Sequence, residues 1–187
     1  MTRPDPAVPL AVTPVPPAEN SPRIYVACLA AYNHGHLHGC WIPATKPREI
    51  MQAVRAMLAS SPVPDAEEWA IHDHEGFEGA EIAEYAGFQT VCDLAEFIRA
   101  HGRLGACLHR HFAGDLAAAR AAFEDHAGQY GSLGEFAESL HRETGTNIPQ
   151  ALQPYIDWQA LGRDMELSGD IMTLRTGIDA LHVFWSQ

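Results

Sequence analysis

The stretch between residues 65 and 96 contains ten carboxylate side chains and no lysine or arginine. Like charges at neighbouring helix positions destabilise a helix, and ordinary solvated surfaces mix charges of both signs. The same stretch contains Trp69, Ile71, Phe77 and Tyr85, which are too apolar for a disordered acidic tail. We therefore expect a folded segment that holds its carboxylates in solvent at fixed positions.

The charge of the chain is divided unevenly. Residues 1–64 carry five basic and three acidic side chains, whereas residues 65–187 carry seven basic and 21 acidic ones, so the net charge of −12 comes from the second part. Such an acidic balance argues against a protein that binds nucleic acid. No stretch approaches 18 consecutive apolar residues, so we expect no membrane-spanning helix.

Catalytic and cofactor motifs are absent from the sequence. There is no nucleophile elbow, no phosphate-binding loop and no dinucleotide-binding glycine motif, so we predict neither an enzyme nor a cofactor. Four cysteines contain no close pair, and no signal peptide is visible. A cytoplasmic protein with reduced thiols is the simplest prediction.

Proline and apolar periodicity divide the first part of the chain. Residues 1–22 contain seven prolines and are expected to form a disordered, extended tail, or alternatively a proline-rich ligand segment. Residues 23–86 are predicted as an N-terminal α+β domain with strands at 23–31, 36–42 and 69–73. A helix with Pro47 in its first turn is predicted from an apolar stripe at positions 50, 53, 54, 57 and 58.

The rest of the chain is predicted to be a helical middle domain over 87–124 and a C-terminal α+β domain over 125–187. The middle domain has a helix capped by Thr90 and ended by Gly102, a short helix at 104–111 and a helix capped by Asp115. Residues 78–86 are expected to form a further short helical unit. In the C-terminal domain, Ser132 and Glu135 form a capping box. It is followed by an interrupted helix over 149–166 and closing strands at 170–175 and 181–185.

Histidines with metal-ligand chemistry occur at alternate positions. On a strand, His34, His36, His38 and Cys40 would share one face and could offer four zinc ligands. However, neighbours on one face of a strand are about 7 Å apart, too far for adjacent ligands of one ion. We therefore predict no metal site, although a metal-dependent hydrolase that uses His34, His36 and His38 stays an alternative.

The acidic stretch has two interpretations. It is either a solvated surface that keeps the protein soluble, or an imitation of the nucleic-acid backbone. On a helix, Glu78, Glu81 and Glu84 would be spaced by about 4.5 Å of rise, close to the ~3.4 Å between phosphates of one DNA strand. A carboxylate carries the charge of a phosphodiester and accepts the same arginine and lysine donors.

Three stretches and the end of the chain resemble the ArdA family of antirestriction proteins. They are IYVACLAAYNHGHLHGCWIPAT (24–45), DAEEWAIHDHEGF (65–77), IPQALQPYIDWQALGRDMELSGDI (148–171) and HVFW near the end. The resemblance implies an elongated α+β homodimer of three small domains, which mimics bent B-form DNA and inhibits type I restriction-modification enzymes by filling their DNA channel. It also implies that residues 152–159 belong to an antirestriction motif near the dimer interface, and that the gene is carried by a mobile genetic element.

These arguments give two predicted sites and a remaining alternative. The predicted DNA-mimicking surface comprises Asp65, Glu67, Glu68, Asp73, Glu75, Glu78, Glu81, Glu84, Asp93, Glu96, Asp115, Glu124, Asp125, Glu135 and Glu138. The antirestriction motif and dimer interface implied by the resemblance comprise Leu152, Tyr155, Ile156, Asp157 and Trp158. The alternative from a third class of protein is an acidic chaperone-like module for a basic partner.

Overall fold

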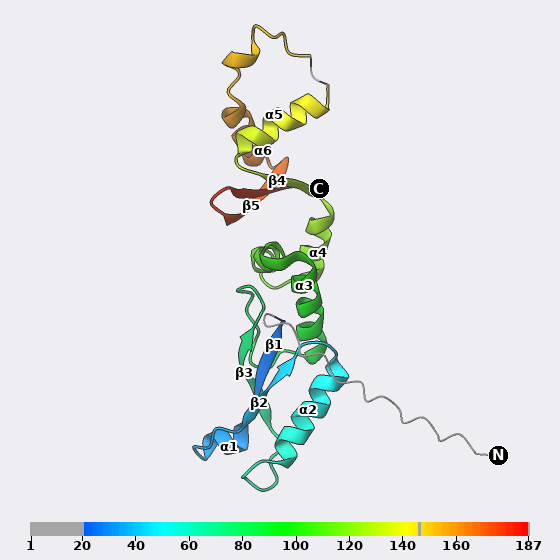
Figure 1. Cartoon of the computed structure of the whole chain (residues 1–187), viewed down its shortest axis with the longest axis vertical. Helices are drawn as coiled ribbons and strands as arrows, with labels where there is room; N and C mark the ends of the chain where they lie inside the picture. Colours follow the sequence, from blue (N-terminus) through cyan, green and yellow to red (C-terminus); the bar gives the residue numbers. More distant parts are fainter. Residues whose placement is uncertain (1–20, 146, 187) are drawn as a thin grey trace, which may run out of the picture.

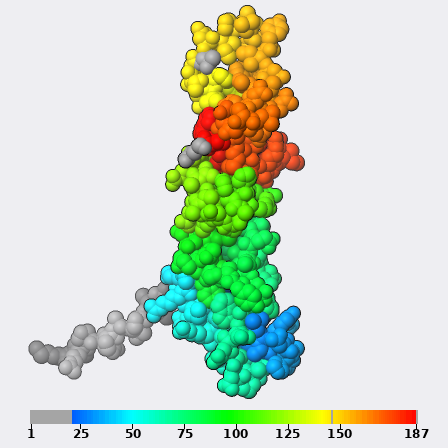
Figure 2. Space-filling model, turned by 180° about the vertical axis from the view of Figure 1, so that it is seen from behind, coloured from blue at the N-terminus to red at the C-terminus, as the bar shows by residue number. Residues whose placement is uncertain are grey.

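The computed structural model describes residues 21–145 and 147–186. Within that part, six α-helices, one short 3-10 helix and two three-stranded antiparallel sheets confirm the predicted α+β class. In Figure 1, the first sheet and α2 lie toward one end of the long axis, α3 and α4 follow, and the second sheet lies with α5 and α6 toward the other end. Figure 2 shows the same succession from behind. The tail predicted at 1–22 lies outside the described residues except for its last two positions.

The first sheet has the order β2-β1-β3. Its strands are β1 (Arg23–Cys28), β2 (Gly39–Pro43) and β3 (Trp69–Glu75). The prediction of one strand over 23–31 is wrong, because α1 (Leu29–Asn33) begins directly after β1. Leucine and alanine favour a helix there, and the sulfur of Cys28 caps it by accepting a hydrogen bond from the Ala31 amide. The second strand accordingly begins at Gly39 and not at 36.

Two helices cover the core face of this sheet. Helix α2 (Pro47–Ala59) begins with Pro47 and buries Ile50, Val54 and Met57, as the apolar stripe predicts. Helix α3 (Phe88–His111) is interrupted at Gly102, whose φ of 54° and ψ of −140° are not helical. The predicted break at Gly102 is therefore confirmed.

The start of α3 differs from the prediction. Its N-cap is Gly87, and Thr90 lies inside the helix. Phe88 explains the earlier start, because its ring is buried and stacks on Trp69 of β3 with centroids 4.5 Å apart. Helix α4 (Leu116–Glu124) starts as predicted, with an Asp115 carboxylate oxygen accepting a hydrogen bond from the Ala118 amide at 3.0 Å.

The helical unit predicted at 78–86 is absent. Residues 76–87 form turns and irregular backbone between β3 and α3. We call this part of the chain the turn segment. Phe77 and Ala80 are almost completely buried and fix it to the first core, while Gly76 and Gly79 adopt positive φ angles. The regular helical spacing expected for Glu78, Glu81 and Glu84 is therefore wrong.

The second sheet has the order β4-β6-β5. It consists of β4 (His126–Tyr130), β5 (Ile171–Gly177) and β6 (Ala180–Trp185). Strands β5 and β6 correspond to the two predicted closing strands, and they pair with each other antiparallel. Strand β4 was not predicted, because its sequence HAGQY has no apolar alternation, and pairing with β6 determines its conformation.

Two helices accompany the second sheet. Helix α5 (Leu133–Glu143) has the predicted cap, with Ser132 Oγ accepting from the Glu135 amide at 3.2 Å. The helix predicted over 149–166 is wrong in its first part. Only a 3-10 turn (Gln153–Tyr155) forms before α6 (Trp158–Ser168), whose N-cap is Asp157. Pro154 is tolerated in that single turn, because the first residues of a helical turn have no hydrogen-bonded amide.

Three apolar clusters form the interior. The first joins the first sheet, α2 and the beginning of α3, and the third joins α5 to the second sheet. The second cluster contains Phe97, Leu104 and Leu108 of α3, Ala119 of α4 and Phe184 of β6. Strand β6 therefore connects the second sheet to α3 and α4. In the described chain, no helix is both long and apolar enough to cross a membrane.

Candidate functional site: the acidic surface

The carboxylates of residues 65–96 are all accessible to solvent. We call these ten side chains the acidic segment. Nine of them are exposed, and Asp93 is half-buried. They come from the loop before β3 (Asp65, Glu67, Glu68), from β3 (Asp73, Glu75), from the turn segment (Glu78, Glu81, Glu84) and from α3 (Asp93, Glu96). None is buried, so all ten side chains remain in contact with solvent.

Arginine neutralises only a small part of the acidic segment. Arg23 Nη2 lies 2.5 Å from Glu75 Oε2, and Arg120 Nη2 lies 3.9 Å from Glu96 Oε2. Exposed pairs of this kind are worth about 0–1 kcal/mol. Within the described residues, no lysine or arginine nitrogen lies within 4.0 Å of the other eight carboxylates. The surface therefore stays strongly negative.

Buried anchors hold the turn segment in place. The rings of Phe77 and His74 meet edge to face with centroids 5.7 Å apart. The backbone oxygen of Glu84 accepts a hydrogen bond from the Ile71 amide of β3 at 2.9 Å, which ties the far end of the turn segment to the sheet. Glu78 has a φ of 52°, a left-handed conformation that costs a non-glycine residue about 1 kcal/mol or more. The carboxylates of the turn segment are thus fixed by tertiary contacts and not by a helix.

The pKa of Tyr85 reflects the negative electrostatic potential of this surface. The charge of Glu84 raises the pKa of its exposed phenol above the ordinary value. Desolvation, a hydrogen bond with Glu84 and the charge of Glu68 act in the same direction. Because a second negative charge is disfavoured there, the same potential would attract a cation.

The predicted acidic residues beyond 96 have local structural roles. Asp115 caps α4, Glu135 accepts a hydrogen bond from the Gly131 amide at 2.7 Å, and Glu138 pairs with Arg142 at 2.8 Å one helical turn away. Glu124 is exposed, and Asp125 is half-buried. These carboxylates add negative charge to the surface, and Glu124 lines a pocket together with Glu96 of the acidic segment.

The predicted motif at 152–158 presents apolar side chains to solvent. Tyr155 is 84% exposed and Leu152 is 55% exposed, whereas Ile156 and Trp158 are half-buried. Asp157 Oδ1 accepts a hydrogen bond from the Ala160 amide at 2.9 Å. The motif thus exposes two large apolar side chains within four residues.

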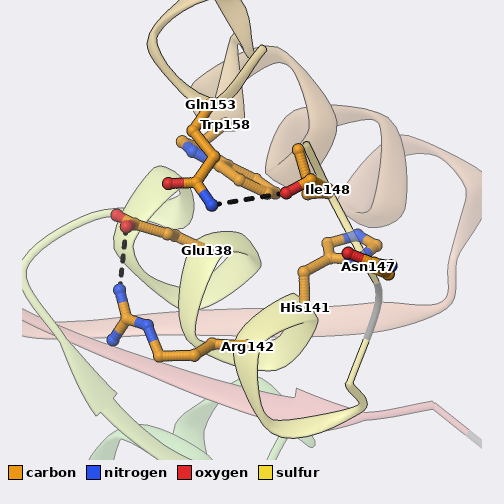
Figure 3. Close-up of a pocket in the computed structure, with 7 residues that line it drawn as sticks. All are labelled: Glu138, His141, Arg142, Asn147, Ile148, Gln153 and Trp158. Carbon is orange, nitrogen blue, oxygen red and sulfur yellow. Dashed lines mark hydrogen bonds and ion pairs between the residues drawn. The ribbon is translucent and has the colours of Figure 1, made fainter. Parts of the chain in front are cut away.

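A pocket that the sequence did not predict lies beside this motif, between α5 and the chain that leads into α6 (Figure 3). Its volume is about 390 Å³, and its lining residues are Glu138, His141, Arg142, Asn147, Ile148, Gln153 and Trp158. The side chain of Gln153 donates to the Ile148 carbonyl at 3.4 Å. The rings of His141 and Trp158 lie 5.4 Å apart. The only feature of the sequence that relates to this pocket is the spacing of Glu138 and Arg142, which allows an ion pair between residues i and i+4 of a helix.

A comparison with known families decides the identity of the chain. The family described as antirestriction protein (ArdA) matches residues 24–180. The chain belongs to the ArdA family. No curated protein matches the chain. The three stretches that resemble ArdA proteins lie within the matched range, so the resemblance is confirmed, and membership supports an antirestriction role.

The ArdA family is one of antirestriction proteins and not a known family of enzymes. In this ArdA protein, His34, His36 and His38 do not lie on a strand but in the turn and loop between α1 and β2. His34 Nδ1 bonds the Ala30 carbonyl at the end of α1, and His38 Nε2 bonds the Met57 carbonyl of α2. Over residues 21–145 and 147–186, no group of three or more His, Cys, Asp and Glu side chains is arranged to hold a metal ion.

Proposed function

We propose that this ArdA protein mimics B-form DNA and inhibits type I restriction-modification enzymes by occupying their DNA-binding channel. The observation that carries the proposal is the acidic segment, in which eight solvent-accessible carboxylates have no lysine or arginine partner within 4.0 Å among the described residues. Membership in the family supports the antirestriction part of the proposal.

The chemistry of the carboxylates supports competition with DNA. Arginine and lysine side chains that bind phosphates also bind carboxylates through charge-assisted hydrogen bonds. Charges fixed on a folded surface require little reorganisation on binding, because the anchors Phe77 and Ala80 already order the turn segment. Association with a basic channel should be fast and should weaken as the salt concentration rises.

The proposal includes an assembly. Three units, at 23–86, 87–124 and 125–187, would follow one another along an elongated molecule, and residues 125–187 would form a homodimer near the motif at 152–158. The exposed Leu152 and Tyr155 support this contact, because their apolar surface would leave water in a dimer. A dimer carries a net charge of about −24 and presents a longer anionic surface than one chain. We place the protein in the cytoplasm, where restriction enzymes act on DNA.

A competition titration against DNA on a purified type I enzyme tests the proposal. The variant E78K/E81K/E84K should inhibit roughly a hundredfold more weakly at low salt, because three exposed attractions of up to about 1 kcal/mol each become repulsions. The matched control E78Q/E81Q/E84Q should lose less, and the loss in both should shrink at higher salt. Equal inhibition by the reversed and native proteins would refute the mechanism.

The same titration separates the proposal from an acidic chaperone-like module. A DNA mimic displaces DNA from the enzyme in proportion to its own occupancy of the channel. A chaperone for an unrelated basic protein would leave the DNA bound. Displacement of DNA therefore distinguishes the two classes.

A further inference from the structure

A small pocket within the acidic segment is lined by two aromatic rings as well as by carboxylates. Its volume is about 340 Å³, and its lining residues are Leu29, Glu67, Glu68, Trp69 and Tyr85. The loop before β3 supplies the two glutamates, β3 supplies the tryptophan, and the turn segment supplies the tyrosine. We call this the aromatic pocket. Its volume is at the small end of the range of about 300–1,000 Å³ for ligand sites, so it suits the end of one side chain.

The walls of the aromatic pocket are ordered by contacts of the first sheet and its core. Trp69 stacks on the buried Phe88 with ring centroids 4.5 Å apart and an interplanar angle of 21°. The Glu68 carbonyl accepts a hydrogen bond from the Leu29 amide at 3.0 Å, which joins two of the lining residues directly. A ligand would therefore meet walls that are already in place and would need to order little of the chain.

Tyr85 offers the face of its ring to a ligand. The side chain is 68% exposed, and it contacts no other ring among the described residues. Its phenol already has a hydrogen bond with Glu84. The hydroxyl is thus satisfied, and the ring face is the part that a ligand can cover. Covering an exposed aromatic ring removes apolar surface from water, which favours binding.

The charges beside these rings select a cation. Glu67 and Glu68 are exposed, and no lysine or arginine nitrogen of the described chain lies within 4.0 Å of either carboxylate. The raised pKa of the Tyr85 phenol shows the same negative potential. An anionic ligand is therefore disfavoured, and a neutral ligand would leave both carboxylates without a charged partner.

A guanidinium group fits all of these features. It is planar and stacks on an aromatic face, it donates two parallel hydrogen bonds to a carboxylate, and it stays charged throughout the working pH range. The methylene stem of an arginine could lie along Leu29 at the same time. A lysine ammonium is a strongly hydrated point charge, so it would use the carboxylates but gain less from the rings.

We propose that the aromatic pocket binds an arginine side chain of the protein partner, with the guanidinium stacked on Tyr85 and hydrogen-bonded to Glu67 or Glu68. The assignment of this arginine to the DNA-binding channel of a type I enzyme rests on the proposed function. A DNA phosphate offers this arginine only charge and hydrogen bonds, whereas the aromatic pocket adds stacking. The pocket therefore gives the protein an advantage over DNA at this one contact.

Fluorine NMR of the full chain labelled with 5-fluorotryptophan tests the pocket without any restriction enzyme. The Trp69 resonance is assigned with Trp69→Phe. N-acetylarginine amide should shift the Trp69 resonance saturably and leave those of the other three tryptophans unchanged. The neutral analogue N-acetylcitrulline amide has nearly the same shape and should cause no shift. N-acetyllysine amide should need a roughly two- to fivefold higher concentration for the same shift, because it gains less from the rings.

Two substitutions at Tyr85 separate the ring from the rest of the pocket. Tyr85→Phe keeps the ring and should bind the arginine probe as the native protein does. Tyr85→Leu removes the ring and should weaken binding by roughly two- to fivefold. Native positions of the other three tryptophan resonances show that each variant is folded, as expected for a side chain that is 68% exposed.

Three results of the titration would overturn the proposal. The first is a Trp69 resonance that the arginine probe does not move. The second is an equal response to the citrulline or the lysine probe, which would show that the pocket does not recognise a guanidinium. The third is native binding of the arginine probe by Tyr85→Leu, which would show that the ring takes no part.

Inhibition of a purified type I enzyme tests the partner. Tyr85→Leu should inhibit roughly two- to fivefold more weakly than the native protein, and Tyr85→Phe should inhibit equally well, although the net charge is the same in all three. If the native protein inhibits and Tyr85→Leu inhibits as strongly, the arginine does not belong to the channel and the assignment is overturned. If the native protein does not inhibit, the proposed function fails, while the titration still decides whether the pocket binds arginine.

Discussion

A substitution at Phe77 tests whether inhibition depends on where the carboxylates lie or only on how many there are. Its side chain is 2% exposed and anchors the turn segment that carries Glu78, Glu81 and Glu84. Replacing it with alanine keeps every charge but removes the anchor. Burial of this kind makes a Phe→Ala change cost about 3–5 kcal/mol, whereas Phe→Leu costs about 1–1.5 kcal/mol. Because small domains are stable by only about 5–15 kcal/mol, Phe77→Leu is the variant expected to stay folded.

The expected effect of Phe77→Leu is a loose turn segment on a folded protein. Hydrogen exchange should accelerate at the amides of Ile71 and Ala80, which donate to the carbonyls of Glu84 and Phe77. Inhibition of a type I enzyme should weaken, by at most about tenfold for a loss of about 1.4 kcal/mol, although the net charge is unchanged. Its dependence on salt should stay the same, because the same number of charges takes part.

Two control variants distinguish a loss of fixed positions from a loss of charge. Leu37→Ala changes an exposed apolar side chain outside the turn segment and should leave both hydrogen exchange and inhibition unchanged. The variant E78Q/E81Q/E84Q should reduce the salt dependence of inhibition while exchange stays slow. If Phe77→Leu accelerated exchange and inhibited as well as the native protein, fixed positions would not matter, and net charge alone would explain inhibition.

Three further predictions concern stability and assembly. Burial lowers the pKa values of His126 and His182, whose rings form a hydrogen bond of 3.1 Å with each other. The two neutral histidines therefore contribute their full stabilisation above the ordinary histidine pKa of about 6.5. This stabilisation is lost as the pH falls below that value, because the unfolded chain binds protons more readily. Thermal unfolding should therefore occur at a lower temperature at pH 5.5 than at pH 7.5, and a double asparagine variant should reduce this difference. Gly162→Ala should cost about 1–3 kcal/mol in denaturant unfolding, because the new Cβ would lie 2.5 Å from the carbonyl oxygen of Leu133 where α6 crosses α5. Tyr155→Ser should shift sedimentation at micromolar concentration toward the monomer without changing the far-ultraviolet circular dichroism, and an unchanged dimer would remove residue 155 from the interface.

Local chemistry explains the parts of the fold that the sequence predicted well. The caps at Asp115 and Ser132 were predicted because a short polar side chain can satisfy a free amide within three residues of itself. Helix α2 was predicted from one apolar stripe after Pro47, and the break in α3 from Gly102. Each of these features depends on residues that are close in the chain.

Two features that the sequence did not predict depend on distant partners. Strand β4 forms because β6, more than 50 residues away, supplies its hydrogen bonds. The pocket beside the motif at 152–158 needs α5, α6 and the connecting chain together. Neither arrangement leaves a periodic pattern in the sequence, because the partner residues are not neighbours along it.

The amino-acid sequence alone determined that this protein would present an unusually negative, folded surface, because ten carboxylates without a basic residue cannot be buried and the aromatic residues among them cannot stay in water. Only the tertiary structure decided where those charges stand. Spacing by three predicted a helix for Glu78, Glu81 and Glu84, but burying Phe77 and Ala80 against the first sheet holds the segment in turns. Burial of apolar side chains outweighed a helix that like charges would have weakened.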